Sequence, residues 1–199
     1  MRLAAVLCAL LSIGVHGQAR AQAPRADFSD AERRSLAAGH LVSRPLAELK
    51  HGQRLVGGIS WQRINQPPDA VWRASLDTNL YPYLFPKLAS AELLSEQPSA
   101  RTVAMHHQHG PFDVRYTLKF SLTPNQRDMH FRMVSTKHPM LKAMWGFITV
   151  IPAGNNSSIL CYGIMGDIGS GFIQGWARPY LQTKLLRVPH YFKRHLERG

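Results

Sequence analysis

Alternation of apolar and polar residues is clearest in the middle of the chain. Every second position is apolar from Val114 through Leu122, namely Val114, Tyr116, Leu118, Phe120 and Leu122. Met129, Phe131 and Met133 repeat the pattern around His130 and Arg132. A period of two is typical of a strand with one buried and one solvated face. These two segments therefore predict neighbouring strands of an antiparallel sheet.

Further β-rich runs extend this predicted sheet. They lie near 55–66, 89–97, 100–109, 146–152 and 158–166, in addition to 112–122 and 127–137. Turn residues separate them, at Gln97-Pro98, Gly110-Pro111, Pro124-Asn125 and Gly154-Asn155-Asn156. The sequence therefore predicts about seven antiparallel strands.

Three short helix signals lie before and after the first predicted strand. Ser29 and Glu32 form a capping box, which begins a helix that we expect to end at Gly39. Residues 40–52 are interpreted as a connector. Pro68 begins a second helix after the first strand, and the prolines at 82 and 86 limit a third helix to a few residues.

The last thirty residues carry a helical pattern. Phe172, Trp176 and Tyr180 recur every four residues, and further apolar residues widen the stripe. Prolines at 179 and 189 are expected to kink this amphipathic helix or to divide it in two. An antiparallel sheet followed by one long helix predicts an α+β domain of two layers, in which the curved sheet grips the helix.

The N-terminal residues have the order of a secretory signal. Arg2 precedes a short apolar run from Leu3 to Val15, and Ala21-Gln22-Ala23 is a small-x-small cleavage site. We therefore expect a signal peptide over 1–23, an N-terminal helical extension and connector over 24–52, and the main domain over 53–199. The expected location is the periplasm or the extracellular space. Cleavage would leave Cys161 as the single cysteine, so no intrachain disulfide is expected.

The charge balance is strongly basic. The chain has 24 Lys and Arg against 12 Asp and Glu, a formal charge of +12. Such a charge favours approach to polyanions. No nucleic-acid-binding motif is present, and an exported protein is not expected to meet nucleic acid, so we exclude that partner. The oligomeric state is not predicted.

Several short motifs resemble one known superfamily. They are Ile59-Ser60-Trp61-Gln62, Pro68-Asp69-Ala70-Val71-Trp72, Leu76-Asp77, Tyr81-Pro82 and Phe85-Pro86-Lys87-Leu88. With the order of elements over residues 56–198, they resemble the START-like (SRPBCC, helix-grip) superfamily, in its polyketide cyclase/dehydrase and coenzyme Q-binding branch. The resemblance implies a curved sheet around a long C-terminal helix, with two short helices after the first strand. The two prolines in the last helix and the export signal depart from the family's usual pattern.

The resemblance also implies a ligand cavity between the sheet and the terminal helix. The side chains expected to line it are Tyr116, Leu118, Phe120, Met129, Phe131, Met133, Phe147, Tyr162, Phe172, Trp176 and Tyr180. Methionine and aromatic side chains suit apolar ligands. Burial of about 300 Å² of ligand surface gives about 7 kcal/mol before the costs of association, consistent with micromolar affinity. The same residues can instead fill a solid core.

Candidate reactive groups are few. His107 and His109 share a strand face and are weak metal candidates, with Asp113 or His130 as a third ligand. Cys161 lies in an apolar strand and is expected to be a core residue. No nucleophile elbow occurs and the carboxylates are scattered, so neither a catalytic residue nor a cofactor is predicted.

Three functions remain open on this evidence. The first is an exported binder or carrier of a lipid, a quinone or a polycyclic compound, and the second is a cyclase or dehydratase acting in the same cavity. The third is an envelope protein that binds anionic membrane through the basic side of its terminal helix. The residues expected to touch that membrane are Lys184, Arg187, Lys193, Arg194 and Arg198.

Overall fold

The computed structural model describes residues 26–50, 53–109, 112–139, 141–167 and 182–198. The helices are α1 (Asp30–Ala37), α2 (Pro68–Leu76), α3 (Tyr81–Leu84) and α5 (Val188–Leu196), with short 3-10 turns η1 (Thr78–Leu80) and η2 (Pro124–Gln126). The strands are β1 (Val42–Lys50), β2 (Gln53–Ile64), β3 (Leu88–Gln97), β4 (Ala100–His109), β5 (Phe112–Thr123), β6 (Asp128–Thr136), β7 (Ala143–Pro152) and β8 (Ser158–Asp167). Among the described helices, none is long and apolar enough to cross a bilayer.

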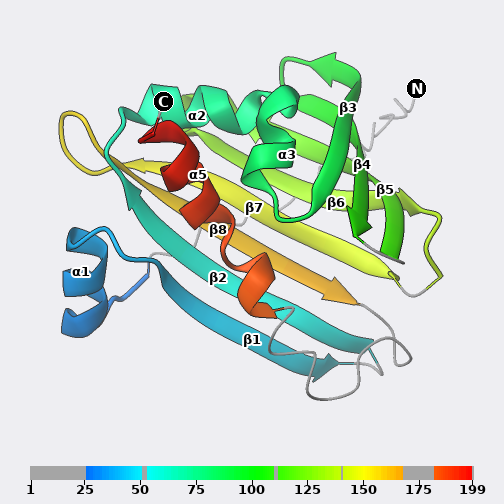
Figure 1. The fold of residues 1–199 in the computed structure, drawn as a ribbon, viewed down its shortest axis with the longest axis horizontal. Coiled ribbons are helices and arrows are strands. Elements are labelled where there is room, and N and C mark those ends of the chain that lie inside the picture. The colour runs from blue at the N-terminus through cyan, green and yellow to red at the C-terminus, as the bar shows by residue number, and fades with distance from the viewer. Residues whose placement is uncertain (1–25, 51–52, 110–111, 140, 168–181, 199) are drawn as a thin grey trace, which may run out of the picture.

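All eight strands form one antiparallel sheet in the order β1-β2-β8-β7-β6-β5-β4-β3. The sheet is strongly twisted, and α2, α3 and α5 lie on one face of it (Figure 1). We call the face under these helices the inner face. The strand boundaries agree closely with those predicted from the alternating pattern, and the predicted helix at Pro68 is α2.

Strand β1 corrects the prediction of a connector over residues 40–52. It pairs with β2 along its whole length, from Val42 opposite Trp61 to Lys50 opposite Gln53. The pattern in β1 is irregular because it is an edge strand, and Pro45 is tolerated there because an edge strand leaves some amide groups unpaired. The sheet therefore has eight strands instead of about seven.

Helix α1 packs on the outer face, opposite the other helices. Its capping box is formed as predicted, with the Ser29 hydroxyl bound to the Glu32 amide. Leu36 joins Val42, Trp61 and Cys161 in a small outer cluster. Arg44 of β1 donates from Nε and Nη2 to the Glu32 carboxylate at 2.9 and 2.8 Å, which fastens α1 to the sheet edge.

The C-terminal segment consists of separate helical pieces in its described part. Residues 182–185 are helical, a turn follows, and α5 begins at Val188 with Pro189 in its first turn. Proline there begins a new helix because its missing amide needs no partner at that position. Gln182 donates to the carbonyl oxygens of Leu46 and Gly57, so this segment is anchored to the two strands at the β1 edge.

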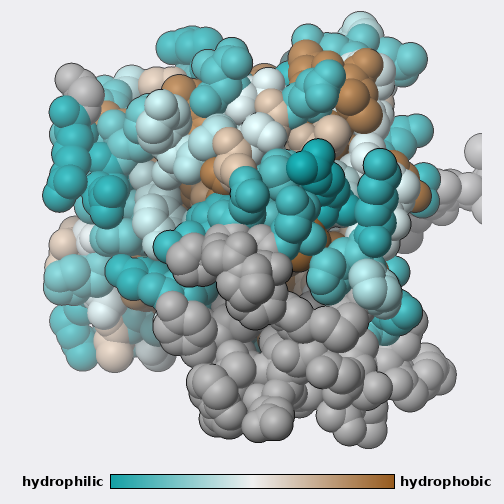
Figure 2. Space-filling model, turned by 45° about the vertical axis from the view of Figure 1, so that its right-hand side comes forward, coloured by the Kyte–Doolittle hydropathy of each residue, from teal (hydrophilic) through white to brown (hydrophobic). Residues whose placement is uncertain are grey.

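Most of the visible described surface is hydrophilic, and apolar residues appear only in small separate areas (Figure 2). The main core lies between the inner face and the helices. It includes α2, α3 and α5 residues and the inward positions of β4 through β8.

Candidate ligand-binding site

The inner face of β5 and β6 carries most of the predicted lining. Leu118 pairs with Met133 and Phe120 pairs with Phe131, so the two strands present facing apolar pairs. Tyr116, Leu118, Phe120, Met129 and Phe131 are buried, and Met133 is half-buried. The sequence thus placed these six residues on the correct face.

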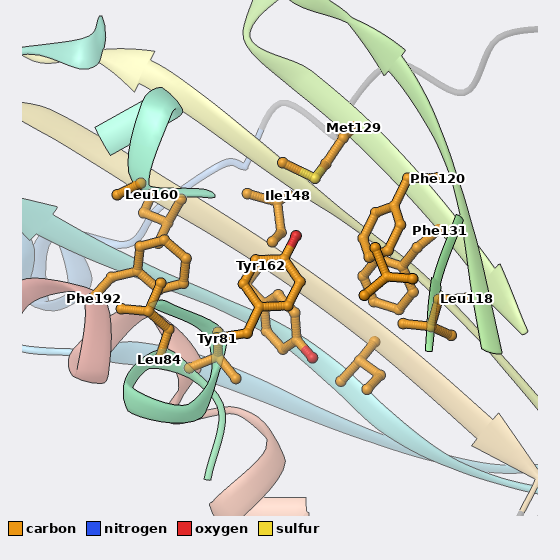
Figure 3. Close-up of a cluster of buried hydrophobic side chains, with 14 of the residues drawn as sticks. Tyr81, Leu84, Leu118, Phe120, Met129, Phe131, Ile148, Leu160, Tyr162 and Phe192 are labelled. Carbon is orange, nitrogen blue, oxygen red and sulfur yellow. The ribbon is translucent and has the colours of Figure 1, made fainter. Parts of the chain in front are cut away.

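One end of the inner face is packed solid. Tyr81 and Leu84 of α3 and Phe192 of α5 lie against Ile148 and Leu160 of the sheet (Figure 3). All five side chains are fully buried. The hydroxyl of Tyr81 donates to the Ser75 carbonyl at 3.0 Å. The buried hydroxyl of Tyr81 therefore has a hydrogen-bond partner. We assign this region to the structural core.

The other end is less completely covered by the described residues. Val114, Met133 and Met144 pack against the core but are only half-buried. The predicted lining residues Phe172, Trp176 and Tyr180 lie outside the described residues. Any ligand space must therefore be sought at this end of the inner face, away from α3 and α5.

An aromatic wall connects the two ends. Phe131 lies 5.7 Å from Phe120 and 6.3 Å from Tyr162, measured between ring centroids. Its ring covers Gly146 on β7, where a Cβ would stand 2.4 Å from the Phe131 Cζ. Glycine at 146 therefore lets the Phe131 ring lie flat on the sheet and keeps the wall in place.

A buried histidine–tyrosine pair lies beside this wall. His107 Nε2 and the Tyr116 hydroxyl are 2.9 Å apart, and the two rings stack with centroids separated by 5.6 Å. Burial lowers the pKa of His107, opposed in part by the nearby backbone of Lys87 and Pro86. Burial also raises the pKa of Tyr116. A neutral imidazole that accepts a hydrogen bond from the tyrosine hydroxyl agrees with both directions.

Tyr162 places a hydroxyl on the inner face, beside the aromatic wall. Its side chain is 2 % exposed, yet its hydroxyl makes no hydrogen bond with any described residue. Burial raises its pKa, and the neighbouring Tyr116 contributes in the same direction. Tyr162 therefore offers an unused donor and acceptor on the inner face.

Phe147 corrects the predicted lining. It lies on the outer face, where it packs with the cluster around Trp61 and Cys161. The inward residues of β7 are Ile148 and Val150, both buried. Residues 144–151 are apolar at almost every position, because both faces of β7 are covered in part, so alternation alone could not assign the face.

The weak metal candidates are not brought together with their expected third ligands. His107 contacts Tyr116, whereas Asp113 contacts His106 on the opposite face, with Nε2 and Oδ2 3.2 Å apart. His130 pairs with Asp128 instead. The side chain of His109 lies outside the described part. Within that part, no three His, Cys, Asp or Glu residues form a possible metal site.

The basic residues near the C-terminus are arranged unevenly. Lys193 contacts Glu197 at 2.8 Å, whereas Arg194 and Arg198 are exposed. Lys184 and Arg187 are half-buried. Their expected contact with an anionic membrane stays a prediction.

Sequence reasoning missed the buried Arg101 of β4. Its side chain is 4 % exposed, its Nη1 donates to the Leu76 carbonyl, and its Nη2 lies 3.0 Å from Glu96. The guanidinium therefore caps the C-terminus of α2 and ties it to β3 and β4. It also missed the His107–Tyr116 pair, although the register of β4 with β5 places these two residues on one face.

No protein-family model matches the chain, and no curated protein matches its sequence. Solved structures do match. The ZhuI aromatase/cyclase from a Streptomyces species superposes with a TM-score of 0.60 at 18% identity, covering 80% of this chain and 95% of that one. A STAR-related lipid transfer protein fragment from Xanthomonas axonopodis gives 0.57 at 13% identity, with 78% and 98% covered. Norcoclaurine synthase from Thalictrum flavum gives 0.53 at 15% identity, with 89% and 97% covered.

These matches extend over nearly the whole length of each neighbour, so they concern the complete domain. They agree with the helices on one face of an open antiparallel sheet and with the C-terminal helix. At such low identity they establish the fold alone. The chain has the START-like (helix-grip) fold.

Proposed function

We propose that the protein is an exported binder or carrier of an apolar small molecule, such as a lipid, a quinone or a polycyclic compound, and that this molecule carries at least one polar group. The observation that supports this most is the hydroxyl of Tyr162, which lies beside Phe131 and Tyr116 on the inner face and bonds to none of the described residues. An apolar ligand with a hydroxyl or carbonyl group would supply the missing hydrogen bond.

The alternative is that the inner-face residues around Tyr162 form a solid core with no ligand. A solid core would use only the apolar ring of Tyr162 and would give its hydroxyl no role. In a ligand site the same hydroxyl orients the ligand, and the surrounding aromatic and methionine side chains supply the apolar contact. The lipid-transfer and aromatase/cyclase neighbours are named for work on such molecules.

Export is part of the proposal and rests on the N-terminal pattern of Arg2, the apolar run and Ala21-Gln22-Ala23. It is tested by expressing the full chain and determining the N-terminus of the protein recovered outside the cytoplasm. A mature chain beginning near Pro24 would support export. A protein retained in the cytoplasm with residues 1–23 still attached would contradict it.

The binding proposal is tested with the mature protein and its Tyr162→Phe variant. Native mass spectrometry before and after organic extraction would show a bound molecule, and re-addition would measure its affinity. We expect Tyr162→Phe to bind about tenfold more weakly, since one hydrogen bond is lost. Tyr83→Phe is the matched control, because Tyr83 is 66 % exposed on α3. A protein that is empty before extraction and indifferent to hydrophobic compounds would refute the proposal.

An enzyme acting in the same place is the second candidate, and the His107–Tyr116 pair favours it. A neutral imidazole bonded to a tyrosine hydroxyl can accept or relay a proton, as a cyclase or dehydratase requires. The enzyme hypothesis predicts that His107→Gln abolishes turnover of a bound ligand without abolishing its binding. A carrier instead returns its ligand chemically unchanged.

A further inference from the structure

The outer face of the sheet has a groove that begins beside α1 and extends toward β7. Helix α1 covers the cluster around Trp61 and Cys161, and the next row of outward side chains includes the exposed Leu46 and Trp145. The groove has a volume of about 330 Å³, at the lower end of the range for small-molecule sites. Its lining includes Arg44, Leu46, Ile59, Trp145, Gly163 and Met165.

Strand register explains why a groove forms here. One outward row runs from Leu46 through Gly57 and Met165 to Trp145, and a glycine interrupts it at β2. The neighbouring row is interrupted by Gly163 on β8, next to Ile59. The apolar side chains on either side of these gaps remain accessible, and Leu46 and Trp145 are 51 % and 40 % exposed.

The charges at the two ends of the groove differ. At the β7 end, Trp145 pairs with Arg132, and Arg132 pairs with Lys119 on the next strand. Both cations are exposed and neither has an ion-pair partner among the described residues. At the β1 end, the Arg44 guanidinium is neutralised by Glu32. The groove is thus apolar along its floor and positively charged at one end.

We propose that this outer groove binds a single-chain anionic amphiphile, such as a fatty acid. The acyl chain lies between Leu46, Ile59 and Met165, and the anionic head lies beyond Trp145 at Arg132 and Lys119. Charge complementarity favours an anionic ligand over a neutral one, because only an anionic head group would form ion pairs with Arg132 and Lys119. The site lies on the opposite side of the sheet from Tyr162 and does not depend on the proposed inner-face ligand.

Decanoate below its micellar concentration is a suitable probe, and decyl maltoside is the neutral ligand with the same chain length. Binding to the mature protein is measured by isothermal titration and by tryptophan fluorescence. We expect decanoate to bind and decyl maltoside to bind at least about tenfold more weakly. Binding should weaken with added salt, because the cations are exposed.

Variants locate the binding site. Arg132→Gln combined with Lys119→Gln is expected to weaken decanoate binding by about tenfold or more. Trp145→Ala is expected to weaken it through loss of apolar contact. Arg34→Gln combined with Arg73→Gln is the control, since it removes the same net charge from exposed helix positions. That control should bind as the wild type does.

The opposite pattern would overturn the proposal. Equal decanoate binding by the Arg132/Lys119 variant would place the site elsewhere, and loss of binding in Tyr162→Phe would place it on the inner face. Binding only to vesicles of anionic phospholipid, with none to decanoate, would make this face a membrane contact. A dimer that Trp145→Ala dissociates, with no decanoate binding, would make it a contact between two copies.

Discussion

Replacing Gly163 by alanine should destabilise the protein through one identifiable clash. An ideal Cβ at residue 163 would lie 2.3 Å from Cε1 and 2.7 Å from Cζ of Phe147. Carbon atoms in contact are about 3.5–4.0 Å apart, so the ring must move by about 1 Å or swing out of the cluster. Overpacking of this kind costs about 1–3 kcal/mol.

The cost is measured by equilibrium unfolding in urea, at constant pH, of the mature protein and its Gly163→Ala variant. A double-mutant cycle with Phe147→Leu isolates the clash, because leucine has no atoms in the positions of Cε1 and Cζ. We expect a favourable coupling of about 1 kcal/mol or more between the two substitutions. In the thermal transition the single variant should melt about 2–4 °C lower for each kcal/mol lost.

Gly166→Ala is the matched control on the same strand. Among the described residues, a Cβ there would meet only the Ala143 carbonyl oxygen, at 3.4 Å, which is an ordinary contact. We expect the free energy of unfolding to change by less than about 0.5 kcal/mol. If Gly163→Ala cost no more than Gly166→Ala, or cost the same with Phe147 and with leucine, the placement of the Phe147 ring on the outer face would be wrong.

Three further predictions concern other groups. The pKa of Cys161 is raised to about 12, chiefly by burial, so at pH 8 only about one part in ten thousand is thiolate, and a thiol reagent should modify it at a measurable rate only after denaturant is added. Burial lowers the pKa of His107 in the folded protein. The contribution of His107 to stability is therefore complete above the unfolded pKa of about 6.5 and is lost as the pH falls below that value. The urea midpoints at pH 7.5 and pH 5 should differ less in His107→Gln than in the wild type. Ser29→Ala removes the hydroxyl that caps α1 and should lower the free energy of unfolding by about 1 kcal/mol, measured by urea unfolding; an unchanged value would mean that α1 is held by its Glu32 contacts to Arg44 alone.

The strands were predictable from sequence because two local signals coincide. Alternation assigns the inward residues of β5 and β6, and the turn residues between strands fix where each strand ends. Helix α2 was predictable for a similar reason, since Pro68 and the apolar residues after it act within one element. These features need no knowledge of which segments meet in space.

The sequence-based predictions were wrong where contact with a segment distant in sequence determines the local structure. Strand β1 exists because β2 pairs with it, and its own sequence, with Pro45 near the middle, gives little sign of a strand. The face of Phe147 depends on α1 and Trp61 covering part of the outer side, so that β7 is apolar at outward positions too. A short-range pattern cannot contain that information.

The candidate site was predicted only in its apolar part, and the reason is physical. Apolar lining follows from alternation, but a polar site is defined by which hydroxyls and imidazoles find partners after folding. Three buried tyrosines show this: Tyr81 bonds to Ser75, Tyr116 bonds to His107, and Tyr162 bonds to no described residue. In the sequence the three are equivalent. Folding separates them, because the first two hydroxyls gain partners within the protein and the third has none among the described residues.

The same reasoning distinguishes the two faces of the sheet. On the inner face the unused group is a neutral hydroxyl within an aromatic wall, which suits an apolar molecule with a hydroxyl or carbonyl group. On the outer face the unused groups are the cations Arg132 and Lys119 beside an apolar groove, which suits an anion with an alkyl chain. One ligand cannot meet both requirements equally well, because a negative charge removed from water beside Tyr162 would find no compensating cation among the described residues there. Anionic and neutral ligands of equal length should therefore be sorted to opposite faces.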